Sequence, residues 1–479
     1  MATVPVTPVF GSIKPSQKQQ LLETNYLNFT DGTNDFAQQY LPEIYEQEVE
    51  RYGNRTLSGF LRMVGAEMPM TSDQIVWSEQ NRLHIAYDDC THSAAVADDI
   101  TFTTNATAGK NFVENVISVN QTIVIMNPAN GAEVKALVVG SVTAGGVASI
   151  SVKSYTSANV APTIPQGTAG LKIFVYGSEY RKGTTDNDIK TVTPSFSQFS
   201  NSPIIIKEKY AINGSDTAQI GWVEVATEDG TSGYLWYLKA ESETRLRFED
   251  YLEMAVVEGE LAAAGSGVAG IAGIAYGGTQ GLFAAIQDRG NVVSGFVAAG
   301  GLGTFDNILK NLDTQGAIEE NMLFLNRSTS LDFDDMLAGL SAGANGGTAY
   351  GLFENSEEMA LNLGFTGFRR GSYDFYKTDW KYLNDASTRG AMADNPIDGV
   401  LVPAGTSTVY DQILGTNIRR PFLHVRYRAS EADDRRMKSW LTGSVGGAYT
   451  SSLDAMEVHF LSERCLVVQA ANNFVLFTK

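Results

Sequence analysis

Residues 234–261 read YLWYLKAESETRLRFEDYLEMAVVEGEL, and this stretch predicts one long α-helix. No proline interrupts it, and Glu241 and Glu243 each precede an arginine by four residues, the favourable order for a helical ion pair. At helical spacing, one stripe of side chains is expected to face a core: Arg245, Phe248, Leu252, Ala255 and Gly259. At 1.5 Å per residue, the helix would span roughly 40 Å.

The segment after this helix carries no charge. Between Glu260 and Asp288 most residues are Gly or Ala, with few Leu or Phe, so the segment is too weakly apolar to insert into a membrane. Gly265-Ser-Gly267-Val-Ala-Gly270 matches G-x-G-x-x-G, but a dinucleotide site needs a strand before that motif, and here a helix precedes it. We therefore expect a flexible Gly-rich hairpin beside a rigid helix.

The composition limits the classes of function. The chain has 479 residues, of which 43% are hydrophobic and 19% charged, and this predicts a globular protein of several domains. A net charge of −19 argues against a surface that grips nucleic acid by its phosphates. Two cysteines, Cys90 and Cys465, do not predict a disulfide framework, and residues 1–10 lack the pattern of a signal peptide.

Strand patterns flank the helix on both sides. Residues 1–34 are polar and predict an extended arm, followed by short helices at 41–52 and 57–64. Strands are expected at 75–79 and 83–87, and again at 204–210. Between them, residues 105–184 contain several short strands and the hairpin-turn signal Asn130-Gly131, and they predict an inserted β-barrel or sandwich with linkers at 101–107 and 183–188.

The C-terminal half predicts mixed α and β structure. Residues 305–336 read as α/β, 343–347 as a flexible loop and 365–380 as strand and turn. Further strands are expected at 399–403 and 422–428, and two closing strands at 466–477 are expected to meet across an Asn472-Asn473 turn.

No group of residues predicts catalysis, a cofactor or a metal site. Asp88–His92 gathers potential ligands with His84 nearby, but its spacing matches no zinc pattern, so a polar loop at a hairpin tip is expected. Leu331–Asp335 lacks the glycine and distal glutamate of a calcium loop and is expected to be the first turn of a helix. With four histidines and no nucleophile elbow, the chain is not expected to be an enzyme.

Several segments, in their order, resemble a known family. Residues 63–79, with Trp77-Ser-Glu79, resemble the start of the extended loop of tailed-bacteriophage major capsid proteins, and Gln198-Phe199 resembles its returning side. The long helix, the Gly-rich stretch and the ending at 462–475 are similar to that family's spine helix, flexible loop and closing strands. Among subfamilies, the chain is most similar to the crAss-like phages.

The resemblance implies an α+β Johnson-type capsid fold with an inserted all-β module. Its parts would be an N-terminal arm and short helix at 1–60, an extended hairpin loop at 61–104 and 185–212, a β-barrel or sandwich module at 105–184, a peripheral domain with spine helix and Gly-rich loop at 213–300, an axial domain at 301–420 and return strands at 421–479.

The resemblance also implies a function. The chain would self-assemble into hexamers and pentamers of an icosahedral head enclosing double-stranded DNA, in the virion, after assembly in the bacterial cytoplasm. Its partners would be further copies of itself, a portal and scaffold or accessory capsid proteins, with no sequence-specific DNA binding and no membrane. The expected interface residues are Trp77, Glu79, Gln198, Phe199, Arg245 and Arg247. The alternatives are a tail or surface-layer subunit and a carbohydrate-active enzyme.

Overall fold

The computed structural model describes residues 66–80, 84–102, 115–144, 147–183, 185, 189–192, 196–219, 224–226, 232–271, 276–295, 302–316, 318–341, 366–392, 395–404, 406–411, 416–445 and 449–479. The predicted arm, the helices at 41–52 and 57–64 and the loop at 343–347 lie outside these residues. The fold is α+β, and the chain divides into two compact units, Trp77–Phe199 and the rest.

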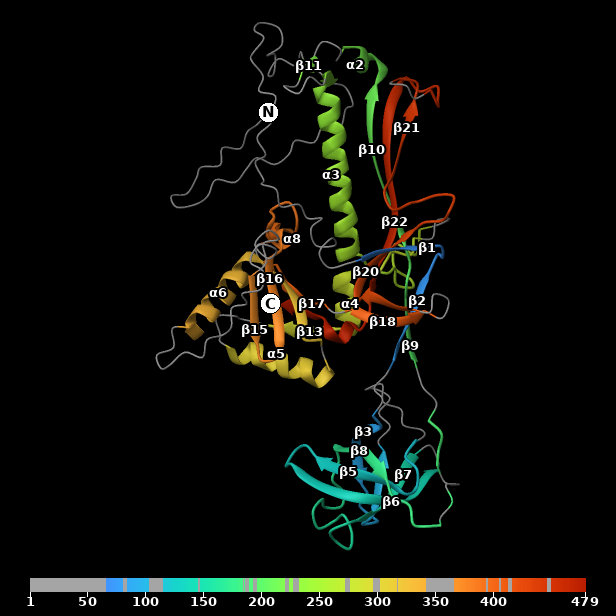
Figure 1. The fold of residues 1–479 in the computed structure, drawn as a ribbon, viewed down its shortest axis with the longest axis vertical. Helices are drawn as coiled ribbons and strands as arrows, with labels where there is room; N and C mark the ends of the chain where they lie inside the picture. The colour runs from blue at the N-terminus through green and yellow to red at the C-terminus, as the bar shows by residue number, and fades with distance from the viewer. Residues whose placement is uncertain are drawn as a thin grey trace. The chain divides into compact units, whose positions relative to one another are not determined.

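The larger unit contains a five-stranded sheet beside one long helix. Its strand order is β1 (Ala66–Met70), β20 (Leu423–Arg428), β22 (Ala455–Val468) and β10 (Ile204–Asn213), and β21 (Lys438–Gly443) also pairs with β22. Helix α3 (Leu235–Glu258) runs along β10 and β22 (Figure 1). Phe248 and Leu252 of the helix pack on Val458 and Phe460 of β22, with the two phenyl centroids 5.8 Å apart. The predicted long helix is confirmed.

One detail of the helix prediction is wrong. Phe248 and Leu252 are buried as expected, but Arg245 has a side chain that is 62% exposed and pairs with Glu249, Nε to Oε1 3.5 Å. The neighbouring Thr244 is buried instead. An arginine is costly to bury without a carboxylate partner, which agrees with Arg245 lying in water and Thr244 in the buried position.

The Gly-rich segment folds back onto the end of α3, which agrees with the hairpin expected there. Leu261 and Gly278 form an antiparallel bridge, and the amide of Gly281 donates to the carbonyl of Gly259 at 2.8 Å. A Cβ at Gly281 would lie 2.6 Å from the Gly259 nitrogen, so glycine is needed for this close approach. The end of the segment enters a helix, α4 (Leu282–Arg289), which the sequence analysis did not anticipate.

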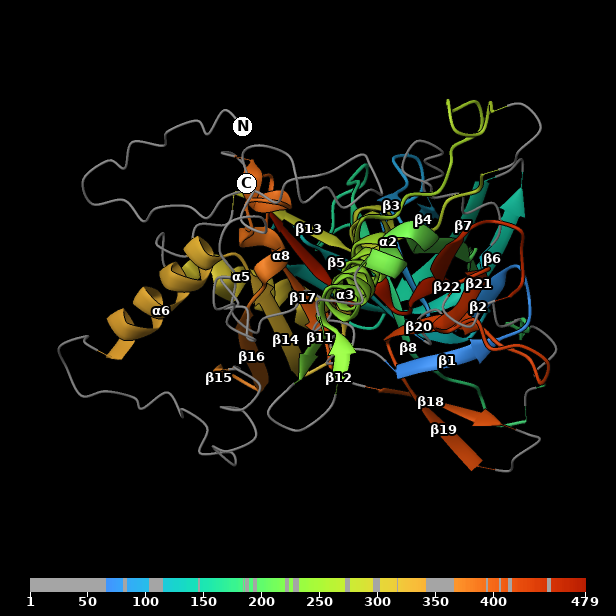
Figure 2. The ribbon, with the colours of Figure 1, turned by 90° about the horizontal axis from the view of Figure 1, so that it is seen from above.

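A six-stranded mixed sheet forms the second layer of this unit. Its order is β13 (Asn291–Ser294), β23 (Val475–Thr478), β17 (Ile397–Pro403), β14 (Glu320–Leu325), β16 (Tyr373–Asp379) and β15 (Thr366–Arg370). Leu323 and Leu325 face a core with α5 (Leu302–Gln315) and α6 (Arg327–Ser341), while Phe324 lies in a core shared with α3 and α4. Viewed along α3, the five-stranded sheet lies on one side of the helix and β14, β16 and β17 on the other (Figure 2).

Two expectations in the C-terminal half are wrong. The closing strands do not form a hairpin, because β22 belongs to the five-stranded sheet and β23 to the six-stranded sheet. Between them, Ala470 has a left-handed backbone, with φ 51°, and the short 3-10 helix η5 (Ala471–Asn473) redirects the chain. Leu331–Asp335 lies in the interior of α6, which begins four residues earlier, rather than in its first turn.

The smaller unit is a closed six-stranded barrel. The strands follow the order β3 (Ala86–His92), β4 (Asp99–Phe102), β7 (Val147–Ser154), β6 (Ala132–Ala144), β5 (Gln121–Asn127) and β8 (Leu171–Ser178). Its interior is filled by aliphatic side chains, among them Ile100, Ile123, Ile125, Val138 and Ile150. The predicted turn joins β5 to β6, with Gly131 at φ 72°. The barrel alternative of the sequence analysis is therefore the correct one.

The N-terminal boundary predicted for this module, residue 105, lies too far along the sequence, because the barrel begins with β3 at Ala86. Residues 86–102 were expected in the hairpin loop and its linker, but β3 and β4 close the barrel. Asp88–His92 is therefore a strand rather than a polar tip, with Cys90 and His92 fully buried. Asp89 has φ 57°, where the register with β8 shifts between Tyr87 and Cys90. This bulge interrupts the alternation by which a strand is recognised.

The extended hairpin is also shorter than expected. Strand β1 pairs with β20 and β10 pairs with β22, so both belong to the five-stranded sheet. Only β2 (Ile75–Gln80) and β9 (Phe196–Asn201) form the hairpin, as a separate two-stranded sheet. Two more short pairs are β11 (Glu224–Ala226) with β12 (Ser232–Tyr234), and β18 (Thr406–Asp411) with β19 (Thr416–Pro421). A one-and-a-half-turn helix, α2 (Gly214–Gln219), follows β10.

Candidate functional site

The β2–β9 ribbon brings together the residues that the sequence analysis selected on both strands. Trp77 and Phe199 face each other across the ribbon, with ring centroids 6.3 Å apart. The Trp77 indole nitrogen donates to Glu79 Oε1 at 3.0 Å, which fixes the ring and the carboxylate. Gln198 is exposed beside them. Aromatic pairing across strands is a recognised source of sheet stability, so these side chains stiffen the ribbon.

A buried amide fixes the C-terminal end of β9. Asn201 is 2% exposed, and its Nδ2 donates to the carbonyls of Gln280 at 2.9 Å and Leu466 at 2.7 Å. Its Oδ1 accepts from the Gln280 amide at 2.8 Å and from the Thr279 hydroxyl at 3.2 Å. All four hydrogen-bonding positions of the amide are used. The side chain therefore ties the ribbon to β22 and to the end of the Gly-rich segment.

A network of charged residues fixes β1, the strand that leads into β2. Glu67 of β1 pairs with Arg436 and lies 3.5 Å from Arg464 of β22. Arg464 is 5% exposed, and its guanidinium also donates to the Ser462 hydroxyl and to the Arg436 carbonyl, both at 2.9 Å. Burial lowers the pKa of Arg464, while the Glu67 carboxylate opposes that effect. The partners thus keep a buried cation compensated.

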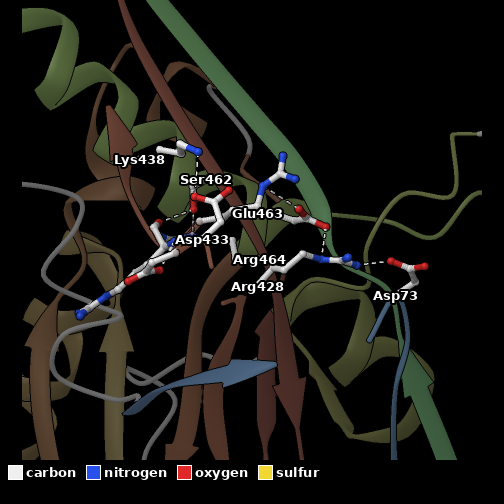
Figure 3. Close-up of polar contacts among 10 residues, drawn as sticks. Asp73, Arg428, Asp433, Lys438, Ser462, Glu463 and Arg464 are labelled. Atoms are coloured by element: carbon white, nitrogen blue, oxygen red, sulfur yellow. Dashed lines mark hydrogen bonds and ion pairs between the residues drawn. The ribbon is translucent and has the colours of Figure 1, made fainter. Parts of the chain in front are cut away.

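The same network continues along β20 and the loop after it. Glu463 forms ion pairs with Arg428, Nε to Oε1 2.8 Å, and with Arg435, Nε to Oε2 3.1 Å, and Arg428 also pairs with Asp73 (Figure 3). The hydrogen bond to Asp73 is the main cause of a raised pKa at Arg428. Because Asp73 lies between β1 and β2, this pair holds the entry to the ribbon against the five-stranded sheet.

A third group joins the end of α3 to the six-stranded sheet. Glu258 accepts both Arg389, whose Nη2 lies 2.6 Å from Oε2, and the Tyr382 hydroxyl. Burial, reinforced by the hydrogen bond to Glu258, raises the pKa of Tyr382. The Arg389 guanidinium also lies 5.1 Å from the centroid of the Phe283 ring in α4. These contacts connect α3, α4 and the short helices α8 (Lys381–Asn384) and η4 (Arg389–Ala391).

The two arginines selected on α3 lie apart from these groups. Arg245 is solvent-exposed and paired with Glu249. Arg247 is half-buried, and its Nη2 lies 3.4 Å from the Thr244 hydroxyl. Sequence reasoning missed Asn201, Glu67 and Glu258, because nothing in their local sequence distinguishes a buried polar side chain from an exposed one.

The described residues offer no metal centre. Within the ranges given above, no three His, Cys, Asp or Glu side chains are placed to hold a metal ion. Both cysteines are buried and neither is in a disulfide, and burial raises the pKa of Cys465 to about 12, so its thiol stays protonated. None of the described helices is long and apolar enough to cross a bilayer. The contacts described above hold segments of the chain together.

Comparison with known proteins gives low similarities. No protein-family model and no curated protein matches the chain. Among solved structures, one from Mycobacterium phage Bobi is 8% identical, with a TM-score of 0.37, over 91% of this chain and 95% of that one. One from Microbacterium phage Oxtober96 is 10% identical, with a TM-score of 0.37, over 94% and 98%. The mature capsid of bacteriophage PhiM1 is 9% identical, with a TM-score of 0.32, over 63% and 79%. With TM-scores below 0.5, these similarities do not decide the fold or the function.

Proposed function

We propose that this chain is the major capsid protein of a tailed bacteriophage, of the crAss-like type, and that it is not an enzyme. It would assemble in the bacterial cytoplasm as hexamers and pentamers of an icosahedral head that encloses double-stranded DNA. The portal and scaffold or accessory proteins would be its partners, and the virion its final location. This proposal joins the resemblance in the sequence to the physical chemistry of the β2–β9 ribbon.

The observation that carries the proposal is the isolation of this ribbon. Strands β2 and β9 pair with each other and, among the described strands, with no third one. A two-stranded sheet is at best marginally stable in water by itself. Val76 on β2 is 56% exposed, although Trp77 beside it is buried. A neighbouring copy would cover this apolar surface, and symmetric assembly supplies such a neighbour at every position.

The anchoring of the ribbon supports the same function. Asn201, Glu67 and Arg428 hold its root through buried or paired polar contacts. A segment that transmits force between subunits needs such a fixed base, whereas a mobile loop does not. The net charge of −19 also suits a protein that encloses DNA without binding it tightly.

Sedimentation velocity of the full chain tests the proposal. Wild-type protein, expressed with the neighbouring virion proteins, is expected to sediment as capsomers or shells. Val76→Asp places a charge on the exposed ribbon surface and should shift the protein towards monomer. Val96→Asp is the matched control, because Val96 is similarly exposed, at 48%, in the loop between β3 and β4. A monomeric wild type, or equal assembly of Val76→Asp and wild type, would contradict the proposal.

A further inference from the structure

The barrel unit carries an exposed group of tyrosines beside a carboxylate. Tyr155 directly follows β7, Tyr176 lies in β8, and Tyr180 follows Glu179 just beyond that strand. These rings are 49%, 51% and 36% exposed, in the order Tyr155, Tyr176 and Tyr180. The Tyr155 hydroxyl donates to Glu179 Oε2 at 2.5 Å. Tyr176 is close enough to Tyr155 to add, as a minor electrostatic effect, to the raised pKa of that phenol. We call these four residues the tyrosine patch.

The backbone holds the patch in place. The amide of Tyr155 donates to the Lys135 carbonyl of β6 at 3.2 Å, and that of Glu179 donates to the Asn120 carbonyl at 2.9 Å. Both ends of the patch are therefore bonded to neighbouring segments of a closed barrel. Tyr176 alternates along β8 with the buried Leu171 and Ile173, so it faces outward from the barrel.

The hydrogen bond between Tyr155 and Glu179 prepares the patch for a ligand. It orients one ring and one carboxylate before any ligand arrives, which lowers the entropy lost on binding. The hydrogen bond to Glu179 raises the pKa of Tyr155 to about 12, so the phenol stays neutral and continues to donate. A carboxylate has several lone pairs and can accept further hydrogen bonds from ligand hydroxyls.

The size of the patch argues against a protein partner. A fully buried tyrosine covers on the order of 200 Å², so three partly exposed rings offer about 300 Å². A stable protein interface needs about 800 Å² from each partner. The patch is therefore too small for a folded protein and large enough for one or two sugar rings.

The chemistry of the patch indicates the kind of sugar. The C–H face of a pyranose is apolar and can lie on an aromatic ring, while its hydroxyls can donate to a carboxylate. The negative charge of Glu179, in a chain of net charge −19, disfavours anionic ligands such as nucleic acid or acidic polysaccharide. These properties together select a neutral saccharide.

We propose that the tyrosine patch on the barrel binds a neutral oligosaccharide, with Tyr155 and Tyr176 stacking on sugar rings and Glu179 accepting sugar hydroxyls. This site lies outside the ribbon and its anchors, and it adds a binding activity to the proposed shell function without depending on it. Residues 105–184 contain no tryptophan, but tyrosine supplies the same kind of flat ring.

The test uses the full chain on a printed array of neutral and acidic oligosaccharides, followed by calorimetric titration of the neutral compound that binds best. The wild type is expected to bind at least one neutral oligosaccharide. Tyr155→Ala and Tyr176→Ala should each lower the affinity at least tenfold, and Glu179→Gln should lower it as well. Tyr449→Ala is the control, because Tyr449 is 84% exposed but belongs to the other unit, and it should bind as the wild type does.

Two readouts keep this proposal separate from the shell function. Circular dichroism checks that each variant retains the folded barrel, and electron microscopy records assembly, which the patch variants should not change. The proposal is overturned if no neutral oligosaccharide binds, if only acidic ones bind, or if folded Tyr155→Ala and Tyr176→Ala variants bind as tightly as the wild type. A wild type that binds a neutral oligosaccharide but does not assemble would instead contradict the shell function alone.

Discussion

A single buried amide, that of Asn201, joins three segments that are far apart in the sequence. Asn201 and Leu466 are 265 positions apart, and Asn201 and Gln280 are 79 apart. The contact exists only because β9, the end of the Gly-rich segment and β22 meet in the folded chain. A polar side chain in such a place must be fully hydrogen-bonded to be tolerated, and Asn201 meets that requirement.

Replacing this amide should destabilise the protein. Asn201→Ala would leave the carbonyls of Gln280 and Leu466 without a donor, and we expect a loss of about 2–3 kcal/mol in the free energy of unfolding. Urea unfolding followed by fluorescence measures the loss. The exposed neighbour Ser200 serves as the control, since Ser200→Ala should change stability by less than about 0.5 kcal/mol. Equal effects of the two changes would show that the amide does not anchor β9.

A second residue-scale prediction concerns pH. Lys209 Nζ lies 3.1 Å from Glu457 Oε1 and holds the pKa of that carboxyl below its usual value. Because the folded pKa is lowered, the pair stabilises the protein above the unfolded pKa of about 4.3, and this contribution disappears as the pH falls through the folded pKa. Lys209→Gln should therefore be less stable than wild type at pH 7, with the difference shrinking by pH 3. A difference that does not change with pH would rule out this pair as its source.

At the scale of elements, the local pattern of residues predicted the long helix and most strands correctly. Within the helix, residues 240–258 alternate buried and exposed positions at helical spacing, and the strand expected at 399–403 lies in the fully buried β17. Which strand pairs with which could not be predicted from the local pattern of residues. β1 lies parallel to β20, with Ala66 opposite His424, and no local pattern specifies a partner so distant.

The errors in element boundaries have physical causes. The bulge at Asp89 breaks the alternation of β3, so the sequence pattern predicts a polar loop where a strand with buried residues lies. Among the selected site residues, Trp77, Glu79 and Phe199 do meet in the ribbon. Their role at an interface between copies stays a prediction, as does that of Gln198, Arg245 and Arg247.

Two leucines of α3 provide a matched test of its buried face. Leu252 is 4% exposed and packs against β22, whereas Leu246 is 50% exposed on the same helix. Leu252→Ala should lower the free energy of unfolding by about 2–5 kcal/mol, because it removes buried atoms and leaves a cavity. Leu246→Ala should cost less than about 0.5 kcal/mol. Chemical denaturation compares the two, and similar losses would mean that α3 does not pack on the sheet through this face.

At the scale of the whole molecule, the barrel is a separate compact unit with its own core. A fragment of residues 77–199 should therefore fold alone, giving a β-type circular dichroism spectrum and a cooperative thermal transition. A fragment of residues 105–184 lacks β3 and β4, which leaves the edges of β7 and β8 unpaired, and it should not fold cooperatively. If the shorter fragment melts as sharply as the longer one, β3 and β4 are dispensable to the barrel.

The larger unit combines features that suit a repeated building block. The end of α3 is joined to α4 and to the six-stranded sheet through Glu258 and Arg389, and the five-stranded sheet holds the root of the ribbon through Glu67 and Asn201. In the shell that we propose, each copy could cover the exposed Val76 of its neighbour's ribbon, which is 56% exposed in the single subunit.

Electron microscopy of the full chain, expressed with its neighbouring virion proteins, tests this central claim most directly. The account predicts closed icosahedral particles built from hexamers and pentamers, in which the β2–β9 ribbon of one copy lies against another copy. Particles whose ribbons contact only their own subunit, or a chain that stays monomeric at high concentration in the presence of those proteins, would contradict it.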